Sequence, residues 1–128
     1  MATRLLIDTD VLIDYLRGGR RATRLLEDPK GELLVSSITV AELYSGVRGA
    51  EEERALDQFL LAFQVVDVDR QIAKNAGAYR HQFSKSHGTG LADALIAASA
   101  ESRQATLVSL NRRHFPMAKG MKVPYSQG

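Results

Sequence analysis

The sequence contains no cysteine, which excludes disulfide bonds, thiolate zinc sites and cysteine nucleophiles. It has no tryptophan and only four tyrosines and four phenylalanines, so a broad platform of aromatic side chains for stacking is not expected. The most apolar stretch, residues 91–100, carries Asp93 and is too short to cross a membrane. An acid is reached already at Asp8, which leaves no room for the hydrophobic region of a signal peptide. We therefore expect a cytoplasmic protein without a membrane partner.

The composition that remains is that of an ordinary globular domain, with 45% hydrophobic and 25% charged residues. A chain of 128 residues buries about two-thirds of its unfolded surface, so we expect one domain over residues 1–128 that folds without a structural metal. The net charge of +2 does not indicate a nucleic-acid binder, but no acid follows Glu101 and the remaining quarter is basic. This quarter and the arginines within 17–24 are either a surface for a polyanion or ordinary solvated surface.

Short apolar runs alternate with segments of helical periodicity along the chain. This alternation predicts an α/β fold with a mostly parallel sheet. The expected strands are 5–7, 33–35, 65–66 and 106–108, with a last weak strand near 121–123. The expected helices are 11–16, a second one ending near 28, one containing 40–47 and closed by Gly49, then 50–63, 69–85 and 91–102, the last being buried on nearly all sides.

Asp8 directly follows a predicted strand and precedes a predicted helix. Open α/β sheets build their sites at the carboxyl ends of such strands, so Asp8 is a candidate site residue. The alternative is that Asp8 or Asp10 only caps the helix, a contact that stabilises by about 1 kcal/mol.

Two further acids stand out by their surroundings. Glu42 follows Thr39 at the spacing of a capping box, which would give both side chains a structural role at a helix start. Asp93 lies among alanines, leucines and an isoleucine, where an isolated carboxylate costs several kcal/mol unless it is paired or binds a metal. Its structural alternative is an acid in the first turn of a helix, favoured by the helix dipole.

Acids from three segments can converge only around positive charge. Mg²⁺ or Mn²⁺ is the natural candidate, because both take oxygen ligands. No zinc-hydrolase motif is present, and the scattered His81, His87 and His114 are expected on the surface.

Four segments in this order resemble the PIN-domain ribonucleases, and among them the VapC toxins of bacterial toxin–antitoxin pairs. The segments are Ile7-Asp8-Thr9-Asp10-Val11-Leu12-Ile13-Asp14, Ser37-Ile38-Thr39-Val40-Ala41-Glu42-Leu43, Asp93-Ala94-Leu95-Ile96-Ala97-Ala98 and Leu107-Val108-Ser109-Leu110-Asn111-Arg112-Arg113-His114-Phe115.

The resemblance implies a three-layer α/β/α sandwich with a central, mostly parallel sheet. It also implies an endoribonuclease that depends on Mg²⁺, with Mn²⁺ as a substitute, and a metal site formed by Asp8, Glu42 and Asp93. Thr9 and Asp10 would support these ligands. A cognate antitoxin protein, an RNA substrate and a homodimer are the partners that the resemblance implies.

One position departs from the pattern of this family, which usually has a fourth acid after the last strong strand. The corresponding segment here is Asn111-Arg112-Arg113-His114-Phe115. We therefore expect one well-occupied metal position rather than two. Asn111 either lies at the site or caps the short helix before Phe115.

Two alternatives to a ribonuclease stay open at this point. The segment Leu5-Leu6-Ile7-Asp8-Thr9-Asp10-Val11 also resembles the opening motif of haloacid-dehalogenase-type phosphatases, in which Asp8 would be the nucleophile and Asp10 the acid/base. The late pair of acids that those enzymes carry is missing, since only Glu101 follows Asp93. The second alternative is a non-catalytic binding module on the same fold, in which the acids only cap helices.

Overall fold

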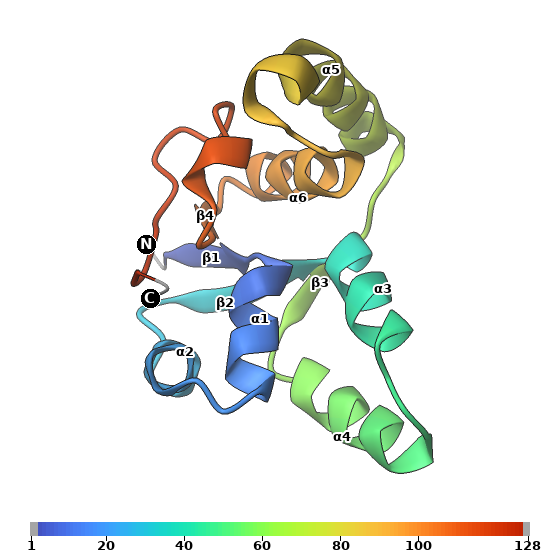
Figure 1. The fold of residues 1–128 in the computed structure, drawn as a ribbon, viewed down its shortest axis with the longest axis vertical. Helices are drawn as coiled ribbons and strands as arrows, with labels where there is room; N and C mark the ends of the chain where they lie inside the picture. Colours follow the sequence, from blue (N-terminus) through green and yellow to red (C-terminus); the bar gives the residue numbers. More distant parts are fainter. Residues whose placement is uncertain (1–2, 127–128) are drawn as a thin grey trace.

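The computed structural model describes residues 3–126, and its centre is a four-stranded parallel sheet (Figure 1). The strands are β1 (Arg4–Ile7), β2 (Glu32–Ser36), β3 (Gln64–Val66) and β4 (Thr106–Val108). They lie in the order β3-β2-β1-β4, and every pair in this sheet is parallel. Leu6 in the central strand β1 is in register with Leu34 and with Leu107.

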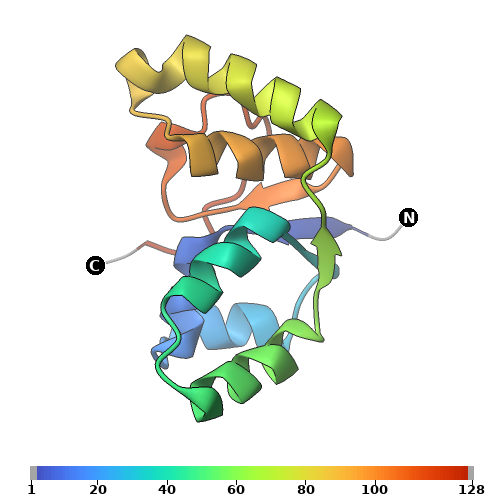
Figure 2. The same cartoon turned by 90° about the vertical axis from the view of Figure 1, so that its right-hand side faces the viewer.

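Helices cover both faces of the sheet, so the predicted three-layer α/β/α sandwich is confirmed (Figures 1 and 2). One layer contains the first four helices and the other contains the last two. The helices are α1 (Thr9–Leu16), α2 (Arg20–Glu27), α3 (Ser37–Ser45), α4 (Ala50–Leu60), α5 (Arg70–His87) and α6 (Leu91–Ser102), and a 3₁₀ turn, η1 (Arg112–His114), follows β4.

The pleat of the strands divides the core in two. Successive residues of a strand point to opposite faces of the sheet, so Leu6 and Leu34 contact the α5–α6 layer while Leu5 and Val35 contact the α1–α4 layer. All four are buried. The run of apolar residues in each strand is therefore what a sheet covered on both faces requires.

Several predicted boundaries are corrected by the structure. Helix α3 begins at Ser37, because the Ser36 hydroxyl accepts a hydrogen bond from the Ile38 N–H. It ends at Ser45, and Gly49, with φ of 89°, precedes α4 instead of closing α3. Residues 121–123 form no strand and contribute one bridge, between Lys122 and Val108. Within residues 3–126, no helix is long and apolar enough to span a membrane.

The order of the strands determines where the chain leaves room for a site. The chain passes outward from β1 to β3 and then returns to β4 on the other side of β1. Connections therefore diverge at the carboxyl ends of β1 and β4, where α/β proteins bind their ligands. Asp8 follows β1 and Ser109 follows β4, and the Asp8 N–H donates to the Val108 carbonyl at 2.9 Å.

Candidate active site

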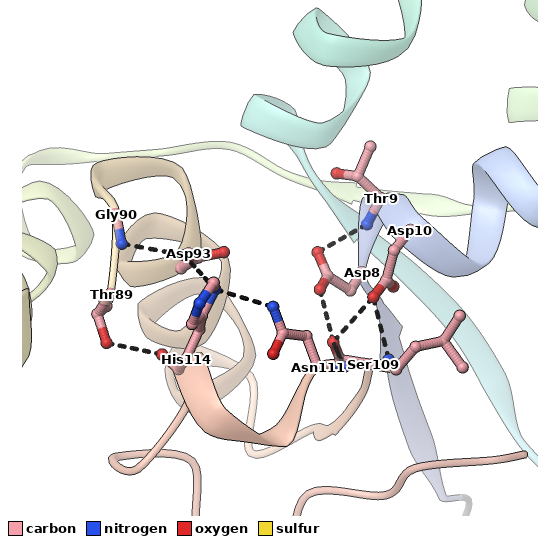
Figure 3. Close-up of polar contacts among 10 residues, drawn as sticks. Asp8, Thr9, Asp10, Thr89, Gly90, Asp93, Ser109, Asn111 and His114 are labelled. Atoms are coloured by element: carbon pink, nitrogen blue, oxygen red, sulfur yellow. Dashed lines mark hydrogen bonds and ion pairs between the residues drawn. The ribbon is translucent and has the colours of Figure 1, made fainter. Parts of the chain in front are cut away.

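Asp8 lies at the carboxyl end of the central strand with only 6% of its surface exposed. One carboxylate oxygen accepts a hydrogen bond from the Thr9 N–H at 2.8 Å, so the predicted capping contact exists. The other accepts from the Ser109 hydroxyl at 2.7 Å (Figure 3). Ser109 was not predicted as a site residue. It directly follows β4, and the same position after a strand is what marked Asp8, which follows β1.

Asp10 lies beside Asp8 and shares its partner. Its Oδ2 accepts a hydrogen bond from the Leu110 N–H at 3.1 Å and is 3.4 Å from the Ser109 hydroxyl. Its Oδ1 is buried and has no hydrogen-bond partner among the described residues. A buried carboxylate oxygen without a partner is costly, so this atom is suited to accept a cation or a hydrogen-bond donor.

The pKa values of these two carboxyls reflect their crowding. Burial raises the pKa of Asp8 to about 7, with a further contribution from the negative charge of Asp10, and the hydrogen bond from Ser109 only partly opposes this. Burial likewise raises the pKa of Asp10, against the hydrogen bond from the Leu110 N–H. Both pKa values are raised because two carboxyls are buried side by side, where each disfavours the charged form of the other.

Glu42 comes from the middle of α3 and is exposed. The capping-box interpretation is wrong, because α3 begins at Ser37 and places both Thr39 and Glu42 inside the helix. Glu42 instead accepts a hydrogen bond from the Thr9 hydroxyl at 2.7 Å. Thr9 is also hydrogen-bonded to the buried Thr39, with 3.0 Å between their hydroxyl oxygens. Thr9 thus connects the acid of α3 to the end of β1.

Asp93 lies in the first turn of α6, and its Oδ2 accepts a hydrogen bond from the Gly90 N–H at 3.0 Å. This is the structural role considered for a first-turn acid, and it uses one oxygen. The same oxygen is 3.4 Å from Nδ1 of His114. The Thr89 hydroxyl donates to the His114 carbonyl at 2.8 Å and fixes the backbone there. His114 keeps 32% of its side chain exposed, so it lies at the surface as expected, but it also contacts an acid of the site.

Asn111 lies between the two groups of acids (Figure 3). Its side chain makes no capping contact with η1, which removes the capping alternative. Its Nδ2 is 2.8 Å from Nδ1 of His114. That ring nitrogen either accepts from the Asn111 amide or, when protonated, faces Asp93, so the two contacts exclude one another.

The acids, Thr9 and Asn111 line one pocket of about 270 Å³, the candidate active site. It is lined by Asp8, Thr9, Asp10, Ile13, Glu42, Ala92, Asp93, Ile96 and Asn111. The structure thus brings together the three acids predicted as ligands and the three residues predicted to support them. Apolar side chains at the pocket wall keep the local dielectric low, which strengthens the charge interactions inside it.

The donor set of the pocket fits a hard divalent cation. It offers four carboxylates and an amide oxygen, one of the carboxylate oxygens being buried and without a partner. Across the described residues, however, no three acidic or histidine side chains are close enough together to form a ready ion cage. Asp93 and Glu42 are held by Gly90 and Thr9, so closing around an ion requires side-chain rotations of these acids.

Comparison with known proteins decides the family. The PIN domain matches residues 5–120 of this chain. The chain belongs to the PIN-domain family. Among its curated relatives, ribonuclease VapC10 of Mycobacterium tuberculosis is 38% identical over 125 residues, which cover 95% of this chain and 93% of that protein. Ribonuclease VapC1 of Methanocaldococcus jannaschii is 32% identical over 94% of this chain and 87% of that protein.

Solved structures of toxin–antitoxin complexes share this PIN fold. A chain of a toxin–antitoxin complex from Klebsiella pneumoniae superposes with a TM-score of 0.83 at 28% identity, covering 96% of this chain and 99% of that one. A chain of the DNA-bound VapBC complex from Salmonella typhimurium gives a TM-score of 0.72 at 26% identity, covering 94% and 96%. The resemblance seen in the four sequence segments is thereby confirmed, and the phosphatase alternative has no support.

Proposed function

We propose that this PIN-domain protein is a VapC-type toxin that hydrolyses RNA with the help of Mg²⁺ or Mn²⁺. One observation carries the proposal: acids from β1, α3 and α6 line a single pocket in which the pKa of Asp8 is raised and an oxygen of Asp10 has no partner. Carboxylates gathered in this way favour a bound cation. The relatives named ribonuclease support RNA as the substrate.

Asp8 and Asp93 would hold the ion, and Glu42 would either share in holding it or orient the attacking water. When bound, the ion supplies a more acidic water and positive charge against the phosphoryl oxygens. The hydroxyl of Ser109 fixes one oxygen of Asp8, and the hydroxyl of Thr9 fixes Glu42. Such supporting contacts set the direction of a ligand's lone pairs, and their loss typically costs 10- to 100-fold, an order-of-magnitude figure, in metal affinity or activity.

The chemistry of the pocket also predicts the products. A water positioned by the acids attacks the phosphorus, so the RNA 2′-hydroxyl is not needed as a nucleophile. The cut strand then carries a 5′-phosphate on one side and a 3′-hydroxyl on the other. Sequence preference would come from exposed single-stranded bases and RNA shape, because this chain has few aromatic side chains for stacking.

The test is RNA cleavage by the purified protein and by three variants, Asp8→Asn, Glu42→Gln and Asp93→Asn. We expect each variant to fold and to lose cleavage, and we expect chelation to stop the wild type and Mg²⁺ or Mn²⁺ to restore it. Asp67→Asn, an exposed acid outside the pocket, is the matched control and should cleave normally. A second measurement is the thermal shift on adding Mn²⁺, which stabilises only a protein that binds it.

Two results would contradict the proposed function. Cleavage that continues unchanged in chelator would exclude the metal mechanism. Variants that are less stable but fully active would show that the acids only cap helices. If the wild type neither cleaves RNA nor is stabilised by Mn²⁺, the non-catalytic binding module becomes the better explanation of the fold.

A groove beside the pocket is where we place the antitoxin. It is lined by apolar and charged side chains from α1, α3, α4 and the α3–α4 connection, and it shares Ile13 and Glu42 with the acid pocket. A partner segment in the groove would therefore lead directly to the acids, where an arginine of the partner can pair with them in place of metal. The neighbouring structures are toxin–antitoxin complexes, which supports such a partner. A homodimer of the toxin is part of the proposal and is checked by sedimentation.

A further inference from the structure

Beside the acid pocket lies a hollow of about 560 Å³ whose ionisable lining is entirely basic. It is lined by Gly77, Arg80, His81, Ser84, Lys85 and Leu91. The first five come from consecutive turns of α5 and the last begins α6. This surface is called the basic hollow below, and neither the acids of the active site nor the groove for the antitoxin uses it.

The basic hollow adjoins the active site through the start of α6. Leu91 lines the hollow, while the next two residues, Ala92 and Asp93, line the acid pocket. Figure 2 shows the carboxyl end of α5 and the start of α6 on the same side of the molecule as the carboxyl end of β1. A ligand in the basic hollow therefore lies next to the part of α6 that carries Asp93 into the acid pocket.

The cations of the hollow are not neutralised by the protein. Arg80 and Lys85 are exposed, and the salt bridges found among residues 3–126 involve neither of them. No acid lines the hollow. Two unpaired cations in a concave surface attract a polyanion and release counter-ions when they meet its phosphates.

The acid pocket gives a reason for such a surface. One divalent ion leaves four carboxylates with a net negative charge, so contacts outside the pocket are needed to hold the RNA phosphates near it. Leu91 adds a second kind of contact, because 54% of its surface is exposed at the rim of the hollow. An exposed leucine offers an apolar face to an unstacked base, while arginine and lysine hold the backbone.

We propose that the basic hollow binds the single-stranded RNA backbone next to the bond that is cut, with Arg80 and Lys85 on phosphates and Leu91 against a base. The proposal rests on the ribonuclease function proposed above. It excludes a second cationic cluster, Arg20 and Arg24 of α2, as the main site for RNA. Those residues lie in the opposite layer of the sandwich, on the far side of the sheet from α5 (Figure 1).

The test compares the two clusters with matched double variants, Arg80→Gln/Lys85→Gln and Arg20→Gln/Arg24→Gln. Both are made in the Asp8→Asn background, so that binding is measured without cleavage. The probe is a short fluorescein-labelled single-stranded RNA, and the readout is the affinity by fluorescence anisotropy over a series of salt concentrations. Circular dichroism of each variant checks that it folds.

The plot of log K against log salt has a negative slope, to which each phosphate contact with a single strand contributes about 0.7. Removing two contacts should therefore make the slope shallower by about 1.4. The affinity near 0.1 M salt should fall by about tenfold or more. Leu91→Ala should weaken binding without changing the slope. The Arg20/Arg24 variant should behave as its background does.

Three outcomes would overturn the proposal. The first is an unchanged slope in the Arg80/Lys85 variant. If the wild type still cleaves RNA in that case, only the basic hollow is excluded and the proposed function stands. The second is a loss confined to the Arg20/Arg24 variant. The third is a change in sedimentation of the Arg80/Lys85 variant with unchanged RNA affinity, which would make the hollow a contact between protein chains. Failure of the wild type to bind or cleave RNA would instead contradict the proposed function itself.

Discussion

At the scale of single residues, Asp8 makes a structural hydrogen bond and carries a negative charge that its burial disfavours. Its carboxylate accepts the hydrogen bond from the Thr9 N–H that begins α1, which stabilises the fold. The same carboxylate is buried beside Asp10, which raises its pKa to about 7. A single acid thus contributes to the helix start and carries a cost that a bound cation would remove.

The first prediction concerns the pH dependence of this cost. Because the folded pKa of Asp8 is raised above its ordinary value of 3.8, the protein loses stability as pH rises from about 4 to about 7 and Asp8 becomes charged. Asp8→Asn removes that charge, so in chelator at pH 8 the variant should be more stable than the wild type. We expect a gain of at least about 1.4 kcal/mol, the equivalent of one pKa unit.

Urea unfolding at pH 8 and at pH 4 measures this effect. The advantage of Asp8→Asn should shrink toward pH 4, where Asp8 is mostly protonated in the wild type. The matched control is the exposed Asp67→Asn, whose difference from the wild type should not grow with pH. A variant that is less stable than the wild type at both pH values would show that the capping contact outweighs the buried charge.

The second prediction concerns Asn111, the residue that stands where this family usually has an acid. It lines the acid pocket and makes no capping contact, so Asn111→Asp adds a fifth carboxylate to the pocket without damaging η1. Attraction to a divalent ion at this range should tighten Mn²⁺ binding by about tenfold or more and lower the Mn²⁺ concentration needed for cleavage.

Calorimetric titration with Mn²⁺ checks the effect of Asn111→Asp. The same change in charge at Asn75, which lies on α5 outside the pocket and contacts Gln71, should leave the affinity unchanged. Equal Mn²⁺ affinity and equal metal dependence in wild type and Asn111→Asp would place residue 111 outside the metal site.

The sequence was sufficient for the acids but not for their partners. Asp8 and Asp93 could be found because each stands in an unusual place, at the end of a strand or among apolar residues. Ser109 also follows a strand, but its role arises from a contact with Asp8 across 101 positions of the chain (109 − 8). His114 has no such local signal, and it contacts Asp93 across 21 positions (114 − 93). Contacts over such separations depend on the sheet order, which periodicity does not determine.

At the scale of elements, the residue at which a helix begins determines which polar side chains cap it and which can contact the site. Sequence spacing assigned a capping box to Thr39 and Glu42, but the serine before α3 caps that helix. Glu42 is therefore free to meet Thr9. The strands and the order of the six helices could be predicted from periodicity, whereas the exact start of α3 depended on a competition between neighbouring hydroxyl residues.

The third prediction concerns Gly77, which lies inside α5. It is exposed there, and an added Cβ would meet nothing within 4 Å. Alanine is the better helix former by about 1 kcal/mol, so Gly77→Ala should stabilise the protein by roughly that amount in thermal or urea unfolding.

Gly88 provides the contrast for this prediction. It ends α5 with φ of 66°, a conformation that costs a residue with a Cβ about 1 kcal/mol or more. Gly88→Ala should therefore destabilise the protein, opposite in sign to the same change at Gly77. If Gly77→Ala also destabilises, some contact of α5 that the structure does not show requires the glycine.

At the scale of the whole molecule, the surfaces around the acid pocket divide between substrate and partner. The basic hollow adjoins the acid pocket from the α5–α6 layer. The groove in which we place the antitoxin adjoins it from the α1–α4 layer. The two share no lining residue, but the groove and the acid pocket share Ile13 and Glu42. An antitoxin in the groove can therefore block the acids without covering the proposed RNA contacts.

The last prediction separates inhibition from catalysis. Leu16 lines the groove, does not line the acid pocket and has 49% of its surface exposed, so Leu16→Asp should leave folding and RNA cleavage unchanged. In a complex with the antitoxin the new charge would be buried against the partner in place of an apolar contact, at a cost of several kcal/mol. We expect the concentration of antitoxin needed for half inhibition to rise at least about tenfold. Leu61→Asp is the matched control, because Leu61 is 76% exposed and lies outside the groove. Equal inhibition of both variants would place the antitoxin elsewhere on the toxin, whereas loss of cleavage by Leu16→Asp alone would make the groove part of the catalytic surface.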